Sequence, residues 1–465
     1  MHLADLPVEV IENILGYLPR HVKQHCLVVC KSWYRITMPG LNRYIQLMGI
    51  EDLMILYRKL LHDPKTIKGS DIRCLSLTAD KASDRYIVRR EVLVRILNAC
   101  THLQTLHLLH DSNQILEYMY QARSELHMDA LKTIYIPFNV VNRVIRGREF
   151  TAIFHYCQKV TQISFNINRD TVRDIPGNMD LGFYLSKFSR LQTLSIHFDN
   201  EVYLHDILSA CPQLEALRLF GGSFLSVTAK LQMYNATEDR IPIKSQLHTL
   251  VVDTGFFTKD LLTYLTTNTE HLYQLTLCGS VSRDVQNLIT AFTAYSNEPR
   301  LNALALKSIR FENHLNFSNE LMQQIRSCFS SSIRRFNFTQ CDFGAIRDEN
   351  TNLMLDLTGF NLEFLTIDIQ NLFEGRIASL NKTSLEIIAH DTKFFQRKSK
   401  WKPGNLFIIK HSNQYVNGNA RERRLKSDHT CVLTIKADSI RYIRLYCHSQ
   451  DNRQLFSQII NLNDA

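Results

Sequence analysis

The chain has 465 residues, of which 45% are hydrophobic and 21% charged, the proportions of a folded protein rather than a disordered one. Its 54 Lys and Arg against 45 Asp and Glu leave a net charge of +9, too small a surplus for a dedicated nucleic-acid coat. Its 11 cysteines include no C-x-x-C pair, which excludes a zinc ribbon and argues against a disulfide framework. With no apolar run of membrane-spanning length and no signal-peptide pattern at the start, we expect an intracellular protein, cytoplasmic or nuclear, that is not membrane-bound.

The first 45 residues predict a unit of three short helices. Asp5 and Pro7 favour a helix that begins at Leu6 or Pro7, because both residue types suit the first turn. A stripe of apolar residues at helical spacing follows, formed by Val10, Ile11, Ile14, Leu15 and Leu18. A second apolar cluster over 27–30 leads into another helix, which Ser32 is expected to cap and which carries Trp33. So small a unit buries little by itself, and we expect part of the stripe to contact a partner.

The order of residues in this unit resembles the F-box family. The matching segments are Leu6-Pro7-Val8-Glu9-Val10, then Ile14-Leu15 and Leu18, then Val29-Cys30-Lys31-Ser32-Trp33. The resemblance implies docking to the Skp adaptor of a cullin-RING ubiquitin ligase. The implied adaptor contacts are Leu6, Pro7, Val10, Ile14, Leu15, Leu18, Val29, Cys30 and Trp33. The alternative is an ordinary amphipathic helix with Trp33 as core.

Four residues of this unit raise the question of a metal. His21, His25, Cys26 and Cys30 are residue types that bind zinc, but their spacing matches no familiar zinc motif. We therefore predict no metal and no cofactor.

A repeat follows the N-terminal unit. Residues 46–70 predict a helical connector. After the connector a six-residue pattern recurs, with apolar residues at its first, fourth and sixth positions. Twelve such starts have a mean spacing of about 28 residues, within the range of leucine-rich repeats. The starts are Ile72, Leu103, Leu131, Val160, Leu191, Leu214, Leu247, Leu272, Leu301, Ile333, Leu362 and Leu385. Stretches with helical spacing, such as 92–97 and 261–265, lie between them.

Strands alternating with helices predict the α/β class. The rule that crossovers between parallel strands are right-handed winds the array into a solenoid with its strands on the concave face. This pattern resembles the F-box/LRR family, which implies a leucine-rich-repeat horseshoe. We accordingly expect an F-box over 1–45, a connector over 46–70, the solenoid over 71–392 and an irregular basic cap over 393–465. An ordinary α/β domain with parallel strands is the alternative.

The concave face is the expected site for a protein substrate, since alternate strand positions point out along it. The candidates there are His107, Tyr135, His197, Arg218, Phe220, Lys307, Arg335 and Phe364. Arg218, Lys307 and Arg335 are suited to pairing with phosphate or acidic side chains, although basic residues scattered on a solvated face are the commoner case.

One segment has a strong charge bias. Residues 393–426 contain ten Lys and Arg against Glu422 alone, interleaved with aromatic residues. Such a mixture is typical of surfaces that bind nucleic acid, but a solvated loop or a localisation signal explains it as well.

No catalytic signature is present in the sequence: it lacks the P-loop, the dinucleotide fingerprint, the zinc-protease motif and the nucleophile elbow. We therefore predict a non-catalytic receptor subunit of an SCF-type ubiquitin ligase. It would bind the Skp adaptor, and through it a cullin-RING scaffold, and present a protein substrate, with no nucleic-acid partner. The alternative is an interaction scaffold or a nucleic-acid-associated protein that uses the 393–426 stretch.

Overall fold

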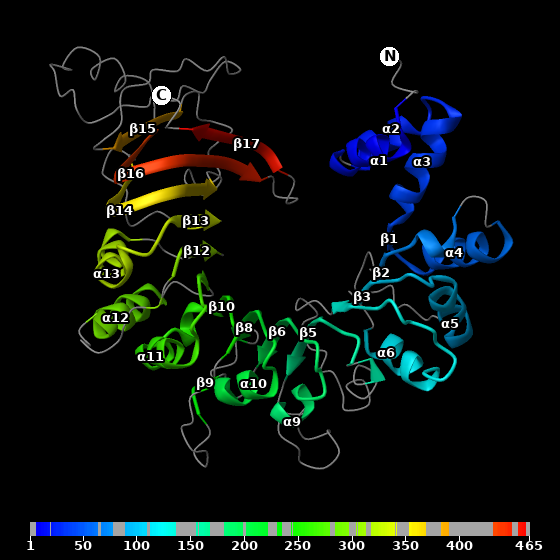
Figure 1. Ribbon diagram of the computed structural model, residues 1–465, viewed down its shortest axis with the longest axis horizontal. Helices are drawn as coiled ribbons and strands as arrows, with labels where there is room; N and C mark the ends of the chain where they lie inside the picture. Colours follow the sequence, from blue (N-terminus) through cyan, green and yellow to red (C-terminus); the bar gives the residue numbers. More distant parts are fainter. Residues whose placement is uncertain are drawn as a thin grey trace. The chain divides into compact units, whose positions relative to one another are not determined.

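The structure is a computed structural model, and its strands and helices fall into two compact units (Figure 1). The first unit comprises Met1–Val202, Asp206–Leu214 and Leu225–Ala229, and the second comprises Tyr203–His205, Glu215–Phe224 and Lys230–Ala465. The described residues are 6–18, 20–63, 67–77, 89–108, 112–135, 155–156, 158–167, 181–198, 201–221, 230–234, 243, 245–279, 284–296, 304, 306–312, 318–339, 341, 353–368, 383–389, 431–448 and 454–461.

Three helices open the first unit, as the sequence predicts. They are α1 (Val8–Tyr17), α2 (Arg20–Cys26) and α3 (Lys31–Asn42), and both α1 and α2 pack against α3. Pro7 is the N-cap of α1, and its carbonyl accepts from the backbone N–H of Val10 at 3.0 Å. The predicted Ser32 cap is wrong: the Sγ of Cys30 accepts from the N–H of Trp33 at 3.5 Å, and α3 begins two residues earlier than predicted.

A parallel sheet follows in the first unit. Its strands are β1 (Tyr44–Leu47), β2 (Cys74–Leu77), β3 (Thr105–Leu108), β4 (Thr133–Tyr135), β5 (Gln162–Ile167) and β6 (Thr193–Phe198), each paired in parallel with the next. The connecting elements are α4 (Ile50–His62), the 3-10 turn η2 (Gly69–Asp71), α5 (Arg90–Ala99), α6 (Ser112–Gln121) and α9 (Leu181–Leu185). Helices α4, α5 and α6 lie along one side of the strands (Figure 1).

The core of this sheet is one row of aligned aliphatic side chains. Strand register places Leu75, Leu106, Ile134, Ile163 and Leu194 side by side, and each is fully buried. Because successive strand residues point to opposite faces, the residues between these apolar positions face away from the helices.

The second unit repeats the arrangement. Its parallel strands are β8 (Ala216–Gly221), β10 (Thr249–Asp253), β11 (Gln274–Cys278), β12 (Ser308–Glu312), β13 (Arg335–Thr339), β14 (Leu353–Asp368), β16 (Cys431–His448) and β15 (Thr383–Ala389), in that spatial order. Between them lie the 3-10 turn η3 (Thr254–Phe256), α11 (Lys259–Asn268), α12 (Asp284–Ser296) and α13 (Asn319–Phe329). The other described elements are two short strands, β7 (Glu201–Tyr203) and β9 (Lys230–Gln232), the helix α10 (Leu204–Ala210) and the C-terminal strand β17 (Gln454–Asn461).

Aligned apolar residues also form the core of the second unit. Leu250, Leu275, Ile309, Phe336 and Leu365 occupy matching positions on neighbouring strands, and each is at most 1% exposed. Side-chain caps fix where the helices begin: Thr258 Oγ1 caps α11 and Ser318 Oγ caps α13, each accepting a backbone N–H at 3.2 Å.

The second unit ends in long strands. Residues 432–435 and 440–445 belong to the single strand β16. β17 (Gln454–Asn461) pairs with it in the antiparallel sense and was not foreseen. The register of β14 against β16 shifts between Leu357 and Asn361, where Gly359 has a φ of 91°. This positive φ favours glycine at the bulge, where a Cβ would also lie 2.8 Å from the Cδ of Arg326.

The predicted repeat is confirmed, with two changes of detail. Every predicted start except Leu301 leads into or lies within a strand, and together they form leucine-rich-repeat-like α/β solenoid units. Leu301 is wrong as a start, because β12 begins at Ser308 and uses Leu306, Ile309 and Phe311 as its apolar positions. Residues 46–70 hold α4 as expected, but strand β1 precedes it and pairs with β2, so strand pairing begins before the predicted connector.

Candidate functional site

The apolar stripe of the N-terminal unit divides into a core and an exposed part. Ile11, Leu15 and Cys26 are buried together. Leu6, Leu18, Trp33 and Ile36 pack against them and are partly buried. Of the nine residues predicted to contact an adaptor, Leu15 is therefore core, and Leu6, Leu18 and Trp33 mainly support it.

The other predicted contacts are on the surface. Pro7 and Cys30 are exposed, and the exposed fractions of Val10, Ile14 and Val29 are 41%, 39% and 63%. Val10 and Ile14 are four residues apart and lie on one face of α1, and Tyr17, at 91% exposure, continues that face by one turn. An exposed row of large apolar side chains on a helix is typical of a protein-docking surface.

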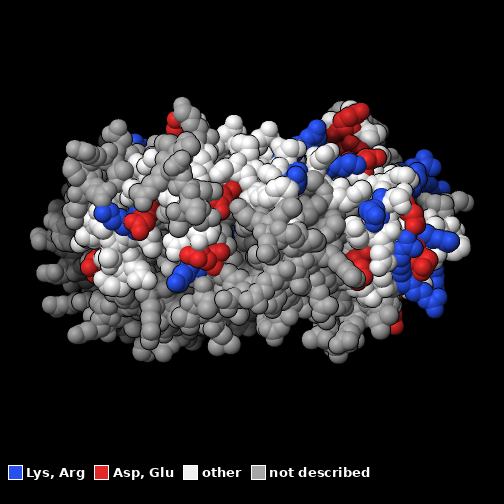
Figure 2. Space-filling model, turned by 90° about the horizontal axis from the view of Figure 1, so that it is seen from below, with Lys and Arg blue, Asp and Glu red and all other residues white. Residues whose placement is uncertain are grey.

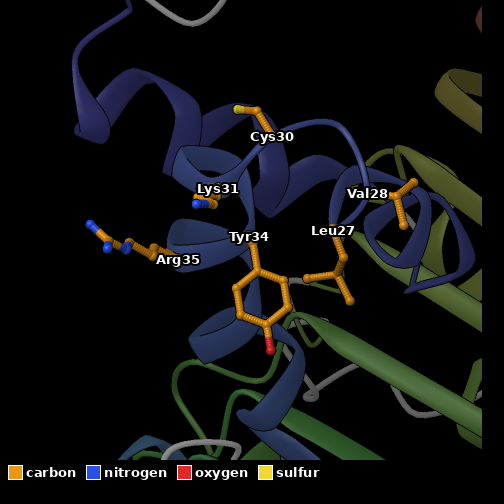
Figure 3. A pocket seen from close by; sticks show the side chains of 6 residues that line it. All are labelled: Leu27, Val28, Cys30, Lys31, Tyr34 and Arg35. Carbon is orange, nitrogen blue, oxygen red and sulfur yellow. The ribbon is translucent and has the colours of Figure 1, made fainter.

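A shallow pocket lies beside the start of α3 (Figure 3). It has a volume of about 400 Å³ and is lined by Leu27, Val28, Cys30, Lys31, Tyr34 and Arg35. Val28 is 86% exposed and Tyr34 is 42% exposed. Neither was among the predicted contacts; the signal for Tyr34 was its spacing of four residues from Cys30, which places both on one side of the first turns of α3.

The concave candidates of the first unit lie on neighbouring strands. His107 on β3 pairs in register with Tyr135 on β4, and their rings are 5.2 Å apart. Burial lowers the pKa of His107 below its ordinary value, which keeps the imidazole neutral at pH 7. His197 is half-buried on β6 and lies two strands from β4. These three residues offer polar and aromatic contacts.

The concave candidates of the second unit form one close group and one separate pair. Arg335 and Phe364 are paired in register on β13 and β14, and the guanidinium carbon of Arg335 lies 5.8 Å from the centre of the Phe364 ring. Arg218 and Phe220 are on β8, three strands before β12 in the sheet order. Lys307 is exposed but precedes β12, so it lies at the end of the sheet where the strands begin and not in a concave position.

Buried thiols have a structural role in the repeats. Burial raises the pKa of Cys100 and of Cys211 to about 12, so both are protonated at neutral pH. The Sγ of Cys341 donates to the carbonyl of Phe311 at 3.3 Å, and that of Cys211 to the carbonyl of Leu185 at 3.8 Å. The thiols thus satisfy backbone groups of the preceding repeat.

Positive and negative charges are mixed on the face of the molecule that Figure 2 shows, where described Lys and Arg side chains are interspersed with Asp and Glu. Ion pairs among the described residues include Arg90 with Glu125 and Lys159 with Asp129. Within the described ranges no three His, Cys, Asp or Glu residues are placed to hold a metal ion, and no helix among them combines the length and apolar character needed to cross a bilayer. The basic 393–426 stretch lies outside the described residues.

Comparison with known proteins identifies the N-terminal unit. The family model described as F-box-like matches residues 3–43, the segment of the three helices. The chain therefore carries an F-box-like domain, followed in sequence by leucine-rich-repeat-like α/β units.

Among individual proteins, no curated protein matches the chain. Among solved structures, it is similar to a chain in the crystal structure of the Rad7 and Elc1 complex in yeast. The sequence identity is 11% and the TM-score is 0.39, over 86% of this chain and 90% of that chain.

Proposed function

We propose that the protein is the substrate receptor of an SCF-type cullin-RING ubiquitin ligase. The exposed apolar row of α1 and the pocket beside α3 bind a Skp adaptor, and the strand face of the solenoid binds a protein substrate. The receptor performs no chemistry in this role. It raises the effective concentration of a substrate lysine near a ubiquitin thioester held elsewhere in the complex.

The observation that carries the proposal is the exposure of Val10, Ile14 and Tyr17 on one face of an F-box-like helix. Three large apolar side chains in a row cost free energy in water at about 25 cal/mol per Å² of apolar surface. A partner that covers them recovers that free energy. The partner implied by the F-box-like match is the Skp adaptor.

A pull-down with purified Skp adaptor tests the proposal. We expect the variant Val10→Asp with Ile14→Asp to lose adaptor binding, because each carboxylate would be desolvated against an apolar partner surface. Its matched control is Glu12→Ala, an exposed position about 200° around the same helix from Val10, which should bind as well as the wild-type chain. Equal binding by both variants, with unchanged helical circular dichroism, would refute docking through this face.

Cys30 provides an independent readout in the unmodified chain. It is exposed and lines the α3 pocket, whereas Cys100 and Cys211 are buried and their pKa values are raised by burial. At about pH 8 we expect iodoacetamide to alkylate Cys30 in the free protein and to spare the two buried thiols. Saturating adaptor should slow the alkylation of Cys30 alone, as measured by peptide mass spectrometry. If saturating adaptor leaves the rate of Cys30 alkylation unchanged, the α3 pocket lies outside the interface with the adaptor.

A further inference from the structure

The edge of the second unit where its strands begin is organised by a ladder of backbone hydrogen bonds. The N–H of Lys307 donates to the carbonyl of Tyr273 at 2.9 Å, that of Arg334 to Lys307 at 2.9 Å, and that of Glu363 to Arg334 at 2.7 Å. These residues therefore occupy the same position on consecutive strands. The register of β14 with β16 places Arg441 next in the row.

Four exposed cations gather at this edge. We call Lys307, Arg334, Arg335 and Arg441 the basic edge; all four are exposed. Glu363 is the carboxylate within their row, and it accepts from the Nε and Nη2 of Arg335 at 3.3 and 3.1 Å. Among the described residues, Lys307, Arg334 and Arg441 have no carboxylate partner, so the basic edge keeps a surplus of positive charge.

An aromatic pair lies beside these cations. Phe364 and Tyr442 are in register on β14 and β16, and their rings stack with centroids 4.8 Å apart. The guanidinium of Arg335 lies over Phe364, and that of Arg441 lies 5.1 Å from the centre of the Tyr442 ring. Ring faces that are already stacked or covered are poor platforms for nucleobases, which bind single-stranded nucleic acid proteins through free aromatic faces. This arrangement favours a peptide ligand over a nucleic acid.

We propose that the basic edge binds an anionic peptide segment, with either acidic or phosphorylated side chains. The inference rests on the proposed receptor function and names the substrate class that the receptor takes. From β12 to β16 the row spans three strand spacings, about 14 Å, which an extended peptide crosses in about four residues. The basic set expected from the sequence was Arg218, Lys307 and Arg335. The basic edge contains Lys307 and Arg335 but not Arg218, and it also contains Arg334 and Arg441. Arg334 directly precedes β13 and Arg441 lies on β16, the two strands that flank β14.

Fluorescence anisotropy on the full-length protein tests the inference. The probes are three labelled peptides of equal length: one with a central run of about five Glu residues, one with phosphoserines in that run, and one with Gln there. A labelled single-stranded oligonucleotide is the fourth probe. The variant Lys307→Ala, Arg334→Ala, Arg441→Ala removes the unpaired cations, and Arg58→Ala, Lys59→Ala, Arg190→Ala removes the same charge from exposed positions of the first unit.

We expect one or both anionic peptides to bind, the Gln peptide not to bind, and the edge variant to weaken binding at least tenfold while the control variant does not. Binding by both anionic peptides identifies charge as the signal, and binding by the phosphorylated peptide alone identifies phosphate. Failure of both anionic peptides, equal loss in the two variants, or edge-dependent binding of the oligonucleotide alone would overturn the inference. Because peptide binding needs no adaptor, this outcome is distinguishable from a failed adaptor pull-down.

Discussion

Replacing Phe336 with alanine is expected to lower the free energy of unfolding of the second unit by about 3–5 kcal/mol. Phe336 is 1% exposed. Its ring lies 6.3 Å from that of Phe311 and 6.0 Å from that of Phe338, both stacked, and makes an edge contact with Phe360 at 5.0 Å. The substitution removes the ring from the centre of this group and leaves a cavity that close-packed parallel strands cannot fill.

Urea denaturation, combined with hydrogen exchange of the β13 amides, measures the loss. Phe364→Ala is the matched control, because Phe364 lies on the neighbouring strand but is only half-buried on the opposite face. That change removes one stacked pair, worth about 1 kcal/mol beyond its buried area. A similar loss in both variants would mean that the aromatic group does not form the core of the second unit.

Periodicity predicted the repeats well because their apolar residues are fixed by a physical constraint. Every strand must bury its side chains against the same layer of helices, so the pattern recurs wherever a strand forms. The four-residue strand β1 escaped detection because only Leu47 in it is buried. It is held in the sheet by backbone hydrogen bonds such as the one from the Cys74 N–H to the Arg43 carbonyl, at 2.8 Å. Backbone hydrogen bonds do not depend on side-chain type, so the sequence pattern does not reveal them.

The error at Leu301 has a different origin. Two versions of the apolar pattern overlap there, one starting at Leu301 and one at Leu306, and both fit the sequence equally well. The neighbouring strands decide between them: Ser308 aligns with Gln274 and Arg335, which places Ile309 and Phe311 in the common core rows. A choice that depends on the partner strands cannot be made from one segment alone.

The basic edge was predicted only in part, for a related reason: the sequence pointed to Lys307 and Arg335 but not to Arg334 and Arg441. Lys307, Arg334, Glu363 and Arg441 lie about 30 residues or more apart along the chain and become neighbours only through strand register. In sequence each is one charged residue at the beginning of a repeat. The pairing of Arg335 with Glu363, which distinguishes a compensated cation from an uncompensated one, is likewise a consequence of register.

The F-box-like domain shows why a stripe of apolar residues predicts a helix but does not show which of these residues form the core and which stay exposed. The stripe of α1 is wider than the core of three short helices can cover, so some of its members must stay exposed. Ile14 and Leu15 are adjacent in sequence and differ by about 100° around the helix. Leu15 is 5% exposed and packs in the core, whereas Ile14 is 39% exposed.

These two neighbours are therefore expected to respond differently to the same substitution. Leu15→Ala should destabilise the F-box-like domain by about 2–5 kcal/mol and abolish adaptor binding because the domain unfolds. Ile14→Ala should leave stability within about 0.5 kcal/mol and weaken adaptor binding through lost contact area. Protection of the α1 and α3 amides from hydrogen exchange, measured beside adaptor affinity, separates the two effects. Loss of protection in Ile14→Ala, or full protection in Leu15→Ala, would mean that core and docking surface are not divided between these two positions.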